Sequence, residues 1–177
     1  MEFMILDAIQ TLRTPWLDGF MVFVSSLGNK GAVWIALAVV LLAFPKYRRL
    51  GAVVACALVL DLVACNLVLK PLVARPRPCD INTALDYLIA RPHGWSFPSG
   101  HTAASFAAVF ALRASGSPLW KPALVLAAGI AFSRLYLYVH WPTDVLGGIL
   151  VGAAAGWAGA RLADALRRRR ERLGRRA

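Results

Sequence analysis

The chain has 177 residues, of which 59% are hydrophobic and 16% charged, with a formal net charge of +11. Soluble domains carry about 45–50% apolar and about 25% charged residues, so this composition excludes an ordinary soluble domain and predicts one membrane-resident domain. More than half of the positive charge, +6, falls in residues 161–177, so it does not predict binding to nucleic acid.

The first 30 residues are predicted to lie on the membrane surface. Residues 1–13 mix apolar with charged positions, as interfacial helices do. Residues 16–27 are apolar but short, and Gly28-Asn29-Lys30-Gly31 interrupts them. We expect two interfacial helices here, with the first half of a broken span as the alternative for the second.

Five further apolar segments are predicted to cross the membrane as helices, each of which needs about 20 residues. They are residues 31–44, 50–69, 99–112, 119–139 and 143–163. The first and third are short, and can be extended by their flanks or begin below the membrane surface. The predicted fold is an all-α integral membrane bundle of five spans plus N-terminal interfacial helices, with six spans as the alternative. Residues 1–177 form one domain, with a basic tail at 164–177.

Basic residues predict the orientation, because lysine and arginine favour the cytoplasmic side. Three basic groups fall on one side of the predicted bundle: residues 46–49, Arg113 with Lys121, and the C-terminal tail. We therefore expect a multi-pass membrane protein with a cytoplasmic C-terminus. The opposite, outer side holds the long polar segment 70–98 and the short turn 140–143.

The cysteines indicate neither a disulfide framework nor a CxxC metal site. Cys56 and Cys65 lie inside an apolar run, and Cys79 is expected in the polar loop. The N-terminus lacks the pattern of a cleaved signal peptide.

Three polar clusters lie at helix ends on the outer side. The first runs from Lys70 to Pro78, where prolines stiffen the chain around Arg77. A lysine at a helix end and an arginine on a rigid loop can converge on one anion. Taken alone, the pair is also consistent with side chains that extend to the membrane surface.

The second cluster is Pro98-Ser99-Gly100-His101, immediately before an apolar helix. A capping serine and a glycine predict a helix N-terminus, whose free N–H groups bind anions. His101 alone could be an ordinary residue of the capping region.

The third cluster contains Arg134 near a helix end, then His140-Trp141-Pro142-Thr143-Asp144. An unpaired charge at the position of Arg134 would be costly in a membrane. Asp144 follows His140 by four residues, so its carboxylate can accept the imidazole N–H and leave the other ring nitrogen free to attack. Such pairs are also common as structural hydrogen bonds.

Together the clusters provide three cations, a helix N-terminus, two histidines and a carboxylate. Phosphoryl transfer needs such parts: positive charge around the equatorial oxygens, an attacking atom and a protonated leaving group. No His/Asp/Glu cluster forms an obvious metal cage in the sequence.

The motifs resemble those of the type 2 phosphatidic acid phosphatase superfamily. They are Lys-x6-Arg-Pro, Pro-Ser-Gly-His and Ser-Arg-x5-His-x3-Asp, here at 70–78, 98–101 and 133–144. Motif order and hydrophobic layout match as well, over most of the chain. The short length looks most like the small bacterial members that dephosphorylate undecaprenyl pyrophosphate.

The resemblance implies a metal-independent mechanism without a cofactor. His140 would form a phosphohistidine, Asp144 would orient it, and His101 would protonate the departing oxygen. The phosphate would be held by the remaining motif residues: Lys70, Arg77, Ser99, Gly100 and Arg134.

The expected partners are a lipid phosphate or pyrophosphate substrate and membrane lipids, without nucleic acid, and homo-oligomerisation is left open. Undecaprenyl pyrophosphate is the first candidate, and phosphatidylglycerol phosphate or phosphatidic acid are alternatives. From other classes, an anion transporter or an inactive lipid-binding homologue would carry similar residues. Release of inorganic phosphate would separate these hypotheses.

Three further predictions concern Asp61, Asn66 and a group of glycines. Asp61 precedes Lys70 by nine residues, about two and a half α-helical turns, so we expect it to face away from Lys70 and to serve packing. Asn66 is expected on the face of Lys70, where it could orient the amine. Four glycines, Gly147, Gly148, Gly152 and Gly156, predict close helix packing within the bundle or between protomers.

Overall fold

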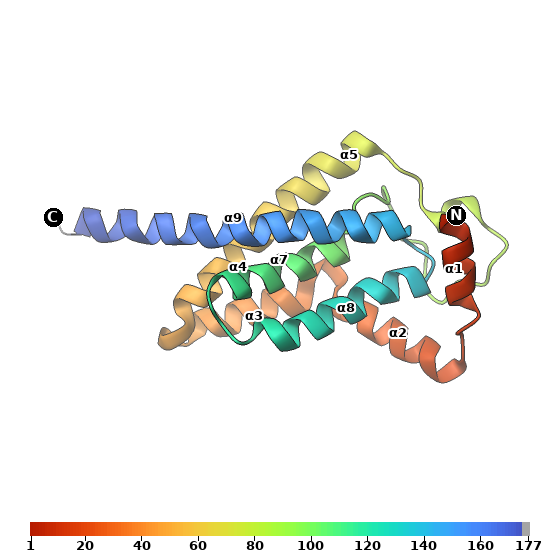
Figure 1. The fold of residues 1–177 in the computed structure, drawn as a ribbon, viewed down its shortest axis with the longest axis horizontal. Helices are drawn as coiled ribbons and strands as arrows, with labels where there is room; N and C mark the ends of the chain where they lie inside the picture. The colour runs from red at the N-terminus through yellow and green to blue at the C-terminus, as the bar shows by residue number, and fades with distance from the viewer. Residues whose placement is uncertain (175–177) are drawn as a thin grey trace.

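The computed structural model describes residues 1–174, and their regular structure is helical throughout (Figure 1). Arg175 and Arg176 of the predicted basic tail lie outside the described residues. The helices are α1 (Glu2–Gln10), α2 (Pro15–Leu27), η1 (Asn29–Gly31), α3 (Ala32–Ala43), η2 (Pro45–Tyr47), α4 (Arg48–Asp61), η3 (Leu62–Leu69), α5 (Lys70–Val73), α6 (Pro78–Ile81), α7 (Gly100–Ala114), α8 (Trp120–Tyr136) and α9 (Pro142–Gly174). The predicted all-α fold is confirmed.

Helix α7 lies at the centre of the bundle and packs against α8, α9 and α4. Four of its nine buried residues are alanine, including Ala103 and Ala107. The glycines of α9 pack against this surface: a Cβ at Gly152 would lie 2.4 Å from the Ala103 carbonyl oxygen, and one at Gly156 would lie 2.7 Å from that of Ala107. The predicted small-residue packing is therefore used inside the bundle, between α9 and α7.

Two helical stretches are long and apolar enough to cross a membrane, Pro45–Ile81 and Pro142–Arg169. A third crossing arises if Pro15–Leu27 and Asn29–Ala43 form one span, bent by 45° at the Gly28 break. This arrangement corresponds to the alternative in which residues 16–27 form the first half of a broken span. The central helices α7 and α8 have 15 and 17 residues, just below and at the lower end of the range for a membrane-spanning helix.

The two ends of the bundle differ in chemistry. Figure 1 shows the C-terminus of α9, the α3–α4 link and the α7–α8 link at one end, and α1 with the N-terminus at the other. The three basic groups noted in the sequence lie in the segments at the first end. The polar motifs lie at the end that α1 covers, so the predicted separation of the two sides is reproduced by the helix arrangement.

The expected orientation of Asp61 is wrong. Asp61 and Lys70 line the same groove, because residues 62–69 form a π-helix, η3, and not an α-helix. A π-helix has i→i+5 hydrogen bonds and more residues per turn, so the nine-residue step covers about two turns and returns to the same face. Asn66 also lines this groove, as expected.

Cys79 does not lie in an open loop. It belongs to the short helix α6 and is fully buried against Tyr136, Leu137 and Val139. Its thiol is therefore unsuitable for reporting the sidedness of the 70–98 segment.

Candidate active site

His140 lies in the turn between α8 and α9, at the end of the bundle that α1 covers. Tyr138 has a left-handed backbone conformation with φ of 60°, which is uncommon for a residue other than glycine. The turn is closed by a hydrogen bond from the Val139 N–H to the Arg134 carbonyl, 3.2 Å long. This tight reversal places His140 inside the protein, 2% exposed.

Asp144 is fully buried in the first turn of α9 and faces His140. Its Oδ2 lies 3.4 Å from Nδ1 of His140, within ion-pair distance but long for a hydrogen bond. The same oxygen accepts hydrogen bonds from the Trp141 N–H at 2.8 Å and from the Ser96 hydroxyl. Catalytic hydrogen bonds are often long before substrate binds, so this geometry suits a His–Asp pair that tightens during reaction.

Arg77 occupies the other side of the imidazole. Its Nη1 lies 3.2 Å from Nε2 of His140 and donates to the Val139 carbonyl at 2.9 Å. Two more carbonyls, of Gly94 and Trp95, accept from its Nε and Nη2 at 2.9 and 3.2 Å. Arg77 therefore lies directly beside His140, and its guanidinium is fixed by three backbone groups.

These contacts indicate the tautomer of His140. A guanidinium is only a donor, so the nitrogen beside it, Nε2, carries the lone pair, and Nδ1 carries the hydrogen towards Asp144. Burial lowers the pKa of His140 to about 3; the Asp144 carboxylate raises it, but the charges of Arg134 and Arg77 act with burial. His140 is thus neutral near pH 7, with Nε2 available to attack.

Arg134 is a second buried cation, 3% exposed. Its Nη1 donates to the hydroxyl of Ser25 on α2, and its Nε has no hydrogen-bond partner among the described residues. Buried guanidinium groups are stabilised by charge-assisted hydrogen bonds, and this one retains an unused donor in the electrostatic vicinity of His140. The site therefore has the means to bind an anion.

Lys70, Asn66 and Gly100 meet at a single point. A Cβ at Gly100 would lie 3.3 Å from Oδ1 of Asn66 and 3.4 Å from Nζ of Lys70, so any larger residue would crowd both. Ser99 precedes this glycine as the N-cap of α7; its hydroxyl accepts from Thr102 at 3.0 Å. The amine of Lys70 therefore lies beside the first turn of α7, where the sequence predicts an anion-binding helix N-terminus.

His101 follows in the same turn of α7, and its ring contacts the break between α2 and α3. Its Nε2 lies 3.0 Å from Oδ1 of Asn29. A Cβ at the neighbouring Gly28 would lie 2.8 Å from the His101 ring, so glycine allows this close approach. An amide oxygen is an acceptor, so Asn29 assigns a hydrogen to Nε2 and orients the ring.

An apolar groove of about 590 Å³ opens beside His101 and Lys70. It follows η1 and α3 from Gly31 to Leu42, about 16 Å along the helix axis, and its other wall is α4 with η3. Asp61 lines it as a buried carboxyl group whose Oδ1 has no hydrogen-bond partner among the described residues. The groove runs from the polar end of the bundle along its exposed apolar side, where Ile35, Val39 and Val59 line it.

Four residues around these groups were not predicted from the sequence: Glu2, Asn29, Arg75 and Ser96. Arg75 and Ser96 both donate to Asp144, and Asn29 contacts His101. Their sequence signal was weak, since each is a common polar residue outside the motifs that contribute the histidines. Only their position in the fold shows what they contact.

Comparison with known proteins adds a family relationship. The PAP2 superfamily model matches residues 46–168. The chain is 35% identical over 138 residues to an undecaprenyl-diphosphatase of Sulfolobus acidocaldarius, covering 77% of this chain and 66% of that protein. It thus spans slightly less than two thirds of this relative's length.

Two solved structures resemble the fold closely. The crystal structure of Aquifex aeolicus LpxE has a TM-score of 0.77 and 29% sequence identity, with 90% of this chain and 94% of that chain covered. The transmembrane PAP2-type phosphatidylglycerolphosphate phosphatase of Bacillus subtilis has a TM-score of 0.71 and 26% identity, with 93% and 83% covered.

Proposed function

This chain belongs to the PAP2 superfamily, and on that premise we propose that it is a membrane lipid phosphatase acting through His140. The observation that carries the proposal is the pairing at the His140 ring. Nδ1 faces the Asp144 carboxylate and Nε2 faces the Arg77 guanidinium. A neutral imidazole oriented in this way presents its lone pair where a phosphate would be bound by cations.

In the first step, Nε2 of His140 attacks phosphorus, and the bond from phosphorus to the leaving oxygen breaks. The ring becomes positively charged as the N–P bond forms, and the Asp144 carboxylate stabilises that charge. Arg77, Arg134, Lys70, Ser99 and the Gly100 N–H bind the nonbridging oxygens. This set of donors compensates the charge that spreads over the equatorial oxygens in the transition state.

His101 supplies the proton that the leaving oxygen takes. A ring that takes up a proton together with the substrate phosphate keeps its Nε2–H on Asn29 and has a second N–H to give. In the second step, water attacks the phosphohistidine, the N–P bond breaks, and the now neutral His101 accepts a proton from that water. Inorganic phosphate leaves, and both histidines return to their starting states.

The groove supports a substrate with a long apolar tail. Lys70 and His101 line its polar end, and its wall is formed mainly by apolar residues of α3 and α4. A tail in this groove would place its terminal phosphate beside the cations. We propose undecaprenyl pyrophosphate as the substrate, with undecaprenyl phosphate as the product, because a bare pyrophosphate requires no additional headgroup site and the relative from Sulfolobus acidocaldarius is an undecaprenyl-diphosphatase.

Phosphatidylglycerol phosphate is the second candidate, favoured by the similarity to the Bacillus subtilis phosphatidylglycerolphosphate phosphatase. The two are separated by measuring phosphate release from both lipids, and from phosphatidic acid, with the purified protein in one detergent. We expect undecaprenyl pyrophosphate to be hydrolysed fastest. At least tenfold faster hydrolysis of either glycerolipid would refute this substrate while leaving the phosphatase assignment intact.

We further propose that the site faces the outside of the cell, where polyprenyl pyrophosphate is released after glycan polymerisation. The exposed Thr83, in the segment between α6 and α7, is a suitable reporter. A Thr83→Cys variant should react with a membrane-impermeant thiol reagent in intact cells. Reaction only after permeabilisation would place the site in the cytoplasm.

A further inference from the structure

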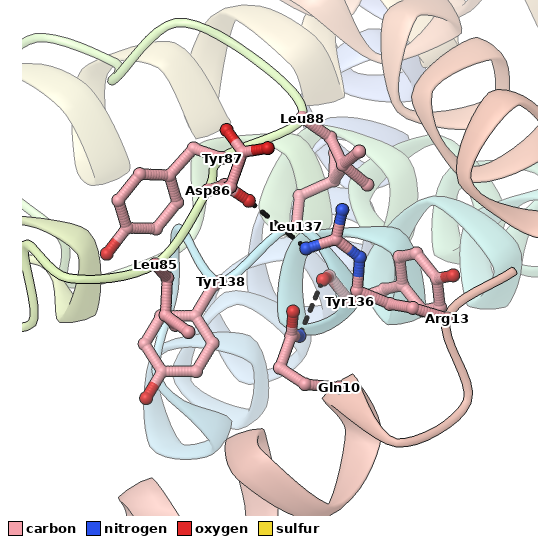
Figure 2. A pocket seen from close by; sticks show the side chains of 9 residues that line it. All are labelled: Gln10, Arg13, Leu85, Asp86, Tyr87, Leu88, Tyr136, Leu137 and Tyr138. Atoms are coloured by element: carbon pink, nitrogen blue, oxygen red, sulfur yellow. Dashed lines mark hydrogen bonds between the residues drawn. The ribbon is translucent and has the colours of Figure 1, made fainter. Parts of the chain in front are cut away.

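Helix α1 is attached to the chain on both sides of His140. Gln10 donates a hydrogen bond of 2.9 Å to the carbonyl of Tyr136, as Figure 2 shows. The fully buried Leu6 lies in one cluster with Tyr138 and Trp141, which flank His140, and the Tyr138 hydroxyl donates to Asp7 of α1. This helix therefore covers the turn that carries the proposed nucleophile.

The N-terminal end of α1 reaches α9 through Glu2. Oε1 of Glu2 accepts hydrogen bonds from the Thr143 N–H at 3.1 Å and from the Thr143 hydroxyl at 2.7 Å. The N–H groups in the first turn of a helix have no intrahelical partner, so this carboxylate satisfies one of them from a distant part of the chain. The other oxygen of Glu2 forms an ion pair with Nη2 of Arg75.

The same guanidinium contacts Asp144. Nη1 of Arg75 lies 2.9 Å from Oδ1 of Asp144, and it also donates to the Thr143 hydroxyl at 2.6 Å. The guanidinium carbon lies 5.0 Å from the centroid of the Trp141 ring, in a cation–π contact. Arg75 is thus shared between two carboxylates, Glu2 and Asp144.

We infer that Glu2 and Arg75 are positioning residues, and that Glu2 tunes through Arg75 the charge that Asp144 offers to His140. The inference rests on the proposed function. Arg75 holds Oδ1, which leaves Oδ2 directed at the His140 ring. Arg75 alone would also neutralise much of the negative charge of Asp144. Glu2 lessens this neutralisation, because its carboxylate pairs with the same guanidinium.

The electrostatic part requires an ionised Glu2. Partial burial raises the pKa of this carboxyl group, but the hydrogen bonds from Thr143 and Arg75 outweigh burial and hold the pKa below its ordinary value. Glu2 is therefore an anion at neutral pH.

The test is a double-mutant cycle with Glu2→Gln, Arg75→Gln and the double variant, using undecaprenyl pyrophosphate and a tag at the C-terminus. Glutamine at position 2 keeps an acceptor for Thr143 but removes the negative charge. Each single change should lower kcat about tenfold, the scale of one charge-assisted hydrogen bond, with KM within about twofold. If Glu2 acts through Arg75, the double variant should have the same kcat as Arg75→Gln alone. The two single losses should then not multiply.

Asp7→Ala is the matched control, because Asp7 accepts a 2.7 Å hydrogen bond from Tyr138 and attaches α1 without touching Arg75. It should lower the thermal unfolding midpoint yet leave kcat within about twofold. Unchanged kcat in Glu2→Gln, multiplied losses in the double variant, or an equal kcat loss in Asp7→Ala would each overturn the inference. Those results require an active wild type; a wild type that releases no phosphate from any of the three lipids contradicts the proposed function itself and the inference with it.

Discussion

The guanidinium of Arg77 lies 3.2 Å from Nε2 of His140, on the side of the ring opposite Asp144. One contact therefore identifies the ring nitrogen that bears the lone pair and supplies a positive charge where the phosphoryl group would be. Because Arg77 is held by the carbonyls of Val139, Gly94 and Trp95, its position does not depend on substrate. Such preorganised charge is a large part of catalysis by electrostatic stabilisation.

Removal of the Arg77 guanidinium should lower kcat strongly. We expect Arg77→Ala to lower kcat about 100- to 1000-fold, the scale of losing one preorganised transition-state donor. Arg77→Lys should recover little, because one ammonium group cannot replace a planar fork that bonds three carbonyls. Arg91→Ala is the control, since Arg91 lies exposed in the same segment, over the Tyr87 ring. Equal losses at both positions would argue against a specific role for Arg77.

Because His140 is buried in its neutral form, the stability of the folded protein should depend on pH. The pKa of His140 is lowered to about 3, whereas an unfolded histidine titrates near 6.5. Between these values the unfolded chain binds more protons, so the folded state loses stability as pH falls, by up to about 1.4 kcal/mol per pH unit. The thermal unfolding midpoint in detergent should therefore fall more steeply from pH 7 to pH 4.5 in the wild type than in His140→Gln. Parallel curves would show that His140 is not buried in its neutral form.

Protonation by His101 should depend on the leaving group. A pyrophosphate releases an alkyl phosphate, which needs less protonation than the alcohol released from a monophosphate ester. His101→Ala and Asn29→Ala should therefore lower kcat more for phosphatidic acid than for undecaprenyl pyrophosphate, with the smaller effect in Asn29→Ala. The two substrates serve as internal controls for each variant. Equal losses on both would remove His101 from the role of proton donor.

The groove should determine how tightly the tail binds. Ala55 lines its wall on α4, so Ala55→Phe should raise KM for undecaprenyl pyrophosphate by about tenfold and leave hydrolysis of a short-chain, soluble pyrophosphate nearly unchanged. Val125→Phe adds a comparable side chain on an exposed position of α8 outside the groove, and KM should stay as in the wild type. An unchanged KM in Ala55→Phe would mean that the tail binds elsewhere.

The sequence predicted the helical fold, the polar end of the bundle and the pairing of His140 with Asp144. These features follow from composition, from helix-end patterns and from short spacings. It could not predict the π-helix at residues 62–69, because an apolar run is compatible with either helical hydrogen-bond pattern. The predicted orientation of Asp61 was therefore wrong.

The supporting residues could not be predicted for a different reason. Glu2 is separated from Arg75 by 73 positions, and Asn29 is separated from His101 by 72. Neither pair has a local spacing that indicates contact. Both depend on where α1 and the α2–α3 break pack, which is decided by the tertiary structure.

The most direct test of the central claim is phosphate release from undecaprenyl pyrophosphate by purified wild type and His140→Ala, measured after confirming that both proteins are folded and membrane-inserted. Loss of a nucleophile lowers turnover by several orders of magnitude, so we expect kcat to fall at least about 1000-fold. Turnover in His140→Ala close to that of the wild type would contradict the account.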